Sequence, residues 1–136
     1  MISFLHRVLS RLFPAVSWTI IIFILLSLPG NMLPSENNLS IPNLDKYVHI
    51  ILFGGFVFLW SYYYAYRSTN KKYTKPTYLI IFLIACIYGT AMEFVQKYFI
   101  PNRDFDLYDI LADVVGALGG YLIVRLTIIP RIKEQN

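Results

Sequence analysis

Long apolar stretches constrain this chain more than any other feature of its sequence. A helix needs about 20 mostly apolar residues to cross the hydrocarbon core of a bilayer. Such stretches cover residues 13–33, 47–66, 77–99 and 107–129. They account for a composition that is 57% hydrophobic and only 15% charged, outside the usual range of soluble domains. We therefore predict an all-α fold, an integral membrane bundle of four transmembrane helices that residues 1–136 form as a single domain.

The basic residues lie between the apolar stretches and predict an orientation. They do not form a basic face on a soluble domain, so the net charge of +4 does not indicate nucleic-acid binding. Loops rich in Lys and Arg stay in the cytoplasm. With the N-terminus inside, nine basic residues lie on the inner side: Arg7, Arg11, Arg67, Lys71, Lys72, Lys75, Arg125, Arg131 and Lys133. Three lie outside: Lys46, Lys97 and Arg103. Both termini are therefore predicted to be cytoplasmic.

The acidic residues have the opposite distribution. Seven of the eight fall in outer loops or outer halves of the predicted helices: Glu36, Asp45, Glu93, Asp104, Asp106, Asp109 and Asp113. Acidic residues contribute little to topology, and ionisable side chains inside a membrane are costly and usually functional. We interpret Glu93, Asp109 and Asp113 as lining a polar pocket that opens to the extracytoplasmic side, and Asp104 and Asp106 as solvated or as caps of the fourth helix.

Helical periodicity places these acids beside small residues. At about 100° per residue, Asp109 and Asp113 share a face with Gly116 and Gly120. A Gly-x-x-x-Gly face lets a neighbouring helix approach closely, so the acids are predicted to face protein rather than lipid.

The second and third stretches repeat this design. Gly89, Glu93 and Gln96 share a face of the third, and Lys97 is placed to pair with Glu93. In the second, Asp45 and His49 are four residues apart, with Lys46 beside them.

These residues form motifs in a fixed order. The segment LDKYVHIILFGGF contains Asp-Lys-x-x-His-x-x-x-Phe. The segment YGTAMEFVQKYFIPNRDFDLYDILADVVGALGG contains Gly-x-x-x-Glu-x-x-Gln, an Arg, and Asp-x-x-x-[Asn/Asp]-x-x-Gly-x-x-x-Gly. In these motifs the chain resembles the VanZ-like family of small bacterial membrane proteins. The resemblance maps motif positions onto Asp45, Lys46, His49, Phe53, Glu93, Gln96, Arg103, Asp109, Gly116 and Gly120. Many members carry Asn where this chain has Asp113.

The resemblance implies a multi-pass protein of the bacterial cytoplasmic membrane and the cell envelope. The family is named after a member associated with resistance to the glycopeptide teicoplanin, and it implies no established reaction. We hypothesise a binding module for a lipid-linked or glycopeptide-related headgroup. The candidate ligand-binding residues are Asp45, Lys46, His49, Glu93, Gln96, Arg103, Asp109 and Asp113, whereas Gly89, Gly116 and Gly120 are assigned to helix packing. Arg103, Lys46 and His49 would contact anionic groups, and Glu93 and Asp113 would contact hydroxyls or amines.

Two other classes of function stay open. An intramembrane hydrolase or transferase acting on an envelope lipid could use His49, oriented by Asp45, as a general base. Asp45, His49, Glu93 and Asp113 could equally hold a divalent metal, although the sequence assigns no metal or cofactor. A structural or assembly partner would use the polar residues only for helix contacts. Membrane lipids are the expected partners, and the sequence does not decide between a monomer and a homo- or hetero-oligomer.

The predicted orientation can be tested with reporter fusions. Fusions at Asn70 and at the C-terminus should both report a cytoplasmic location, because the basic residues are concentrated on that side. An extracytoplasmic signal from either fusion would refute both the orientation and the outward-facing pocket.

Overall fold

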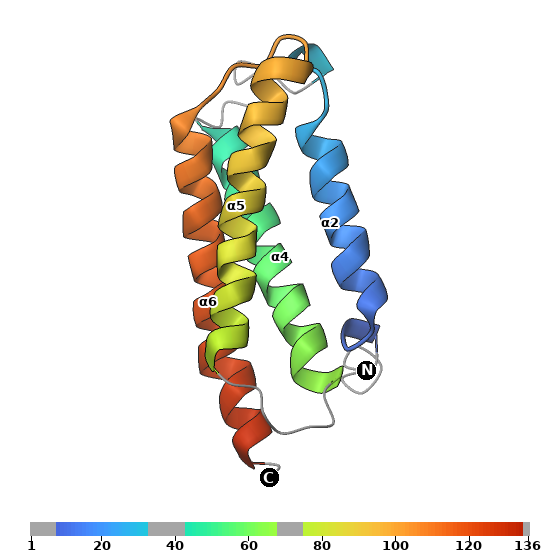
Figure 1. Cartoon of the computed structure of the whole chain (residues 1–136), viewed down its shortest axis with the longest axis vertical. Helices are drawn as coiled ribbons and strands as arrows, with labels where there is room; N and C mark the ends of the chain where they lie inside the picture. The colour runs from blue at the N-terminus through green and yellow to red at the C-terminus, as the bar shows by residue number, and fades with distance from the viewer. Residues whose placement is uncertain (1–7, 33–42, 68–74, 135–136) are drawn as a thin grey trace.

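A computed structural model describes residues 8–32, 43–67 and 75–134. Its helices are α2 (Leu12–Leu26), α4 (Leu44–Arg67), α5 (Lys75–Phe99) and α6 (Leu107–Glu134), with a short 3-10 helix η1 (Gly30–Met32) after α2. Successive helices run in opposite directions, so that α2 begins and α6 ends at the same end of the bundle (Figure 1). The described residues contain no strand, which confirms the predicted all-helical fold.

Three of the helices are long and apolar enough to cross a membrane, over Leu44–Arg67, Thr77–Phe99 and Leu107–Ile128. The predicted spans at 47–66, 77–99 and 107–129 therefore coincide with α4, α5 and α6. Large apolar side chains point out of the bundle, and Ile51, Ile87 and Leu126 are 64%, 69% and 72% exposed. An apolar exterior of this kind fits lipid better than water.

The first predicted span, residues 13–33, is longer than the helix found there. Helix α2 ends at Leu26 after 15 residues. At about 1.5 Å per residue it covers roughly 22 Å, less than the ~30 Å hydrocarbon core. Pro29 follows shortly afterwards and cannot continue a helix. The chain turns into η1 instead, where the Gly30 N–H donates a hydrogen bond to Pro101 O at 3.1 Å.

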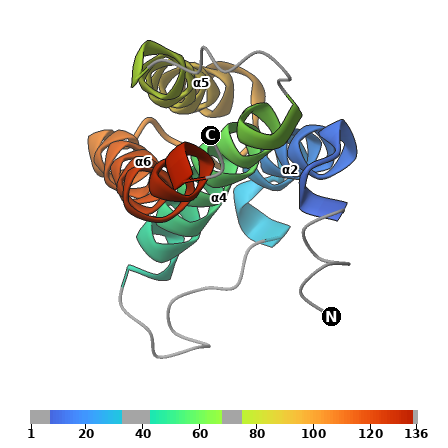
Figure 2. The ribbon, with the colours of Figure 1, turned by 90° about the horizontal axis from the view of Figure 1, so that it is seen from below.

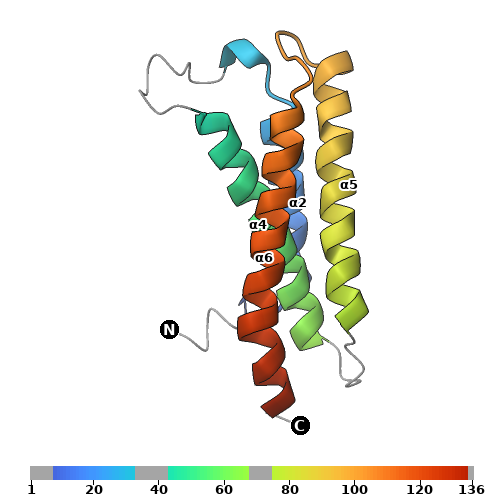
Figure 3. The same ribbon diagram turned by 90° about the vertical axis from the view of Figure 1, so that its left-hand side faces the viewer.

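Helix α4 lies at the centre of the bundle. Seen along the bundle axis, it has α6 on one side, α2 on the other and α5 across the top of the view (Figure 2). Helix α6 packs most extensively against α4, whereas the backbones of α2 and α5 approach each other at few points. A perpendicular view shows α6 crossing in front of α4 with α5 alongside (Figure 3). The apolar core between these helices includes Ile22, Phe53, Phe56, Ala85 and Met92.

Glycines bring α4 and α6 into backbone contact. A methyl group at Gly116 would collide with the backbone of Ile50, and one at Gly120 would lie 2.5 Å from Gly54 O. One at Gly54 would lie 3.0 Å from Gly116 O. Gly116 and Gly120 thus lie on the face that periodicity assigned to packing. Gly54, on the partner helix, is part of the same contact although the sequence analysis did not single it out.

Adding one methyl group to this contact tests its importance. We expect Gly116→Ala to cost about 1–3 kcal/mol, because overpacking forces the two backbones apart. Gly119→Ala is the matched control, since a methyl group there would meet nothing within 4 Å, and Ala favours helix over Gly. Ala117 would be a poor control because it is itself buried. Thermal unfolding in detergent measures both variants, and equal unfolding temperatures would contradict the importance of the contact.

Candidate functional site

The first two turns of α6 carry two carboxylates, Asp109 and Asp113, that point into the bundle. Asp106 immediately precedes the helix, and its Oδ1 accepts a hydrogen bond from the Tyr108 N–H at 2.8 Å, which is the usual arrangement of an N-cap. Asp109 and Asp113 follow on the inward face. They are 4% and 1% exposed, so both are shielded from the surroundings of the bundle.

His49 on α4 faces these two acids. Its Nδ1 lies 2.8 Å from Asp113 Oδ1, and its Nε2 lies 3.9 Å from Asp109 Oδ2. The first distance is a hydrogen bond and the second is too long for one. The sequence hypothesis oriented His49 through Asp45, four residues earlier on the same helix. The structure instead gives the ring a partner on α6, because His49 points into the interface between α4 and α6.

Glu93 on α5 completes the buried group. It is fully buried, and its Oε2 accepts a hydrogen bond from the Asp106 N–H at 3.1 Å. Its other oxygen, Oε1, has no hydrogen-bond partner among the described residues. Lys97, which the spacing placed as a partner, lies over the rings of Tyr98 and Phe105 instead. One turn before Glu93, Gly89 leaves the space that the Asp113 carboxylate occupies.

Lys46 neutralises the outer part of the group. Its Nζ lies 2.7 Å from Asp45 Oδ2 and 2.7 Å from Asp109 Oδ1, and it also donates a hydrogen bond to Asp106. This hydrogen bond holds the pKa of Asp106 below its ordinary value. One ammonium therefore serves carboxylates from α4, from the loop before α6 and from α6 itself.

Together these side chains form what we call the polar cluster: Asp45, Lys46, His49, Glu93, Asp106, Asp109 and Asp113. It has a buried floor and a half-exposed rim. The side chains of Asp45, Asp106 and Lys46 are 40%, 37% and 21% exposed, whereas His49, Glu93 and Asp113 are buried. The polar cluster is thus buried at its base and partly exposed at its rim.

Two predicted site residues lie elsewhere. The Gln96 side chain donates a hydrogen bond to Leu26 O at 2.9 Å, so it holds the end of α2. Arg103 lies half-buried in the loop between α5 and α6, and its Nε has no hydrogen-bond partner in the described ranges. Asp106 was interpreted from sequence as solvated or as a helix cap, and its bonds to Lys46 and Glu93 were missed. Glu36, another outer acid, lies outside the described residues.

Two groups of side chains have the spacing of metal ligands. His49, Glu93 and Asp109 each offer one donor atom, and these atoms lie within 4.8 Å of one another. Asp45, Asp106 and Asp109 form a second group with the same property. The second group surrounds the Lys46 ammonium, so a cation already belongs to it.

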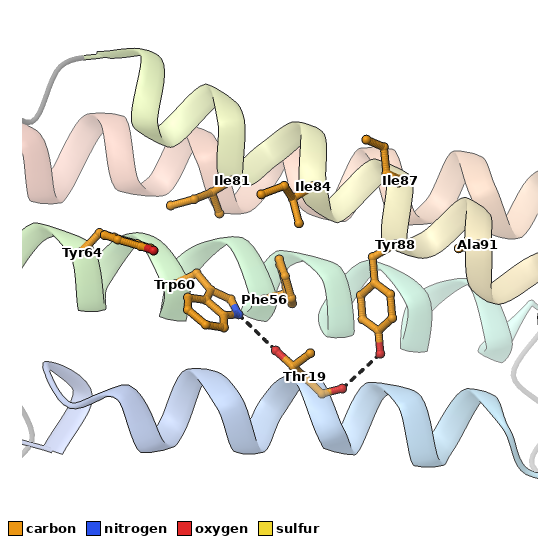
Figure 4. Close-up of a pocket in the computed structure, with 9 residues that line it drawn as sticks. All are labelled: Thr19, Phe56, Trp60, Tyr64, Ile81, Ile84, Ile87, Tyr88 and Ala91. Atoms are coloured by element: carbon orange, nitrogen blue, oxygen red, sulfur yellow. Dashed lines mark hydrogen bonds between the residues drawn. The ribbon is translucent and has the colours of Figure 1, made fainter.

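An apolar cavity of about 610 Å³ lies between α2, α4 and α5. Its lining residues are Thr19, Phe56, Trp60, Tyr64, Ile81, Ile84, Ile87, Tyr88 and Ala91 (Figure 4). Thr19 accepts hydrogen bonds from Trp60 Nε1 at its hydroxyl and from the Tyr88 hydroxyl at its carbonyl, both at 3.1 Å. The walls suit hydrocarbon, and they offer no charged group that would select a particular ligand.

Comparison with known proteins identifies the family. A family profile described as VanZ/LLP1 matches residues 7–129. The chain belongs to the VanZ/LLP1 family. The match and the long apolar helices together indicate a membrane protein of this family, and the association with glycopeptide resistance rests on the family's name. No solved structure matches the chain.

A curated relative comes from outside bacteria. An uncharacterized protein of the yeast Schizosaccharomyces pombe is 32% identical over 95 residues, which cover 70% of this chain and 55% of the yeast protein. The chain therefore spans about half the length of that relative. Location in a bacterial cytoplasmic membrane stays a prediction from the sequence motifs.

Removing the Lys46 charge tests the electrostatic part of the site. We expect Lys46→Met to lower the free energy of unfolding by about 1.5–3 kcal/mol, the usual contribution of a hydrogen bond to a charged group, because three carboxylates lose a shared cation. Lys97→Met is the matched control, since that exposed lysine lies over aromatic rings, a contact worth about 0.5–1 kcal/mol. Equal falls in the unfolding temperature of the two variants would show that the ion pairs of Lys46 add no more stability than the ring contacts of Lys97.

Proposed function

We propose that this VanZ/LLP1-family protein binds the polar headgroup of a membrane lipid at the polar cluster. One observation carries the proposal: side chains from three helices converge there, and the two most deeply buried carboxylates each have one oxygen without a hydrogen-bond partner in the described part of the chain. These oxygens are Glu93 Oε1 and Asp113 Oδ2. A buried polar atom without a partner costs about 1–3 kcal/mol, so a ligand that satisfies it is a physical reason for its presence.

The charges of the cluster favour one class of headgroup. Asp45, Glu93, Asp106, Asp109 and Asp113 carry five carboxylates, against the single ammonium of Lys46. Carboxylates accept hydrogen bonds and repel bare anions. We therefore favour a headgroup rich in hydroxyls or amines, such as the sugar part of a lipid-linked precursor or a glycopeptide-related group.

The position of the cluster suits an amphipathic ligand. Its rim lies at the start of α4 and α6, where a spanning helix would leave the hydrocarbon core. Glu93 lies six residues before the end of α5, about 9 Å along the helix axis. A lipid in the surrounding leaflet could present its headgroup to Asp45, Lys46 and Asp106 while its chains stay among the apolar side chains outside the bundle.

A second function has its own supporting observation. The hydrogen bond between His49 and Asp113 is the arrangement that orients a histidine as a general base. A hydrolase or transferase acting on the bound lipid would use His49 to take a proton from the attacking group. The same headgroup site would then also be a reaction site.

Glu93→Gln tests the binding function. The amide can still accept the Asp106 N–H, so we expect the variant to unfold within a few degrees of the wild type. It should retain about 10–100-fold less lipid, because a hydrogen bond to a charged group typically contributes 1.5–3 kcal/mol. Native mass spectrometry of detergent-extracted protein measures the lipid that co-purifies.

Asp104→Asn is the control for this experiment, since Asp104 is an exposed acid in the loop between α5 and α6. It should retain as much lipid as the wild type. If Glu93→Gln instead unfolds at a much lower temperature while lipid per folded molecule is unchanged, the cluster has a purely structural role and the binding proposal is wrong.

A further inference from the structure

The two ring nitrogens of His49 have different surroundings. Nδ1 is hydrogen-bonded to Asp113 Oδ1 at 2.8 Å. Nε2 faces Asp109 Oδ2 at 3.9 Å, beyond hydrogen-bonding range. When Nδ1 carries the proton donated to Asp113, Nε2 presents a lone pair to the acids. Histidines that bind metals are usually held in this way, with the second nitrogen donating to a carboxylate.

Two carboxylates lie where further metal ligands would be needed. Donor atoms of His49, Glu93 and Asp109 lie within 4.8 Å of one another. Ligands that each lie about 2.1 Å from one ion at a tetrahedral angle are roughly 3.4 Å apart, so small side-chain rotations would bring these atoms together. Glu93 supports this assignment independently, because it is fully buried and its Oε1 has no partner in the described part of the structure.

The two groups of possible metal ligands differ in whether a lysine lies among their acids. Asp45, Asp106 and Asp109 have the same close spacing, and the Lys46 ammonium lies among them. In the inner group, Lys46 contacts Asp109 alone, and the described residues place no lysine or arginine beside His49 or Glu93. Buried carboxylates need a counter-charge, since unpaired charges are strongly disfavoured in apolar surroundings. Of the two groups, only the inner one therefore has a place for an added cation.

We propose that His49, Glu93 and Asp109 bind a divalent transition-metal ion, with Asp113 as the positioning residue that orients His49. One imidazole with two carboxylates suits Zn²⁺ or Mn²⁺ better than the all-oxygen sites typical of Mg²⁺ and Ca²⁺. Three protein ligands leave a coordination position open. For what fills that position the inference rests on the proposed function: an oxygen atom of the lipid headgroup would bind there.

The test uses the full-length chain without an affinity tag, purified in detergent, treated with EDTA and freed of the chelator. Titration with Mn²⁺, followed by the electron paramagnetic resonance signal of the free ion, should show saturable binding of one ion per chain, and Zn²⁺ should displace it. Absence of saturable binding of both ions to the wild type would overturn the proposal, and that measurement depends on no variant.

Variants assign the ligands. We expect His49→Gln and Asp109→Asn to weaken Mn²⁺ binding by at least roughly tenfold, and Asp113→Asn by about 10–100-fold, the usual effect of losing an orienting carboxylate. Asp104→Asn should bind like the wild type. Binding that is unchanged in both His49→Gln and Asp109→Asn would place the ion elsewhere and refute this site.

Lipid analysis of the same metal-free and Mn²⁺-loaded samples separates this inference from the headgroup proposal. Saturable Mn²⁺ binding in protein that retains no lipid supports the metal site and refutes the lipid function. Lipid retention in protein that binds neither ion refutes the metal site and leaves the lipid function standing.

Discussion

The close approach of α4 to α6 fixes the distances within the polar cluster. Gly116 lies against the backbone of Ile50, and Gly120 lies against that of Gly54. His49 directly precedes Ile50, so the contact that brings the backbones together also brings the ring to within 2.8 Å of Asp113. Hydrogen bonds of this kind tolerate only a few tenths of an ångström. A side chain added at Gly116 or Gly120 would therefore break the hydrogen bond between His49 and Asp113 even if it moved the two helices only slightly apart.

The distribution of polarity in this bundle is the reverse of that in a soluble protein. Large apolar side chains cover much of the outside, whereas the ionisable side chains of His49, Glu93, Asp109 and Asp113 are buried inside. The Lys46 ammonium neutralises the carboxylates of Asp45, Asp106 and Asp109. The chain does not supply a comparable cation to Glu93, whose Oε1 lacks a described partner. This asymmetry is the physical reason to expect an added cation at the base of the cluster and not at its rim.

Sequence periodicity predicted the three long helices and the inward face of α6, because hydrophobic length and a repeat of 3.6 residues depend only on local sequence. It could not predict partners across helices. Asp45 and His49 have suitable spacing on one helix, yet Asp45 bonds Lys46 while His49 bonds Asp113 on α6. These choices depend on the rotation and register of α4 against α6. The end of α2 was also misjudged, since the helix ends at Leu26, three residues before Pro29, which cannot continue a helix.

The early end of α2 affects the polar cluster through the loop between α5 and α6. Because the helix ends at Leu26, the chain turns early, and Gly30 reaches the loop between α5 and α6 through Pro101 O. Gln96 holds the same end of α2 through Leu26 O. That loop continues to Asp106, whose N–H binds Glu93 and whose carboxylate binds Lys46. A helix long enough to reach residue 33 would carry Gly30 away from Pro101. The early end of α2 therefore helps to hold the loop that closes the polar cluster, although α2 supplies none of the residues of the cluster.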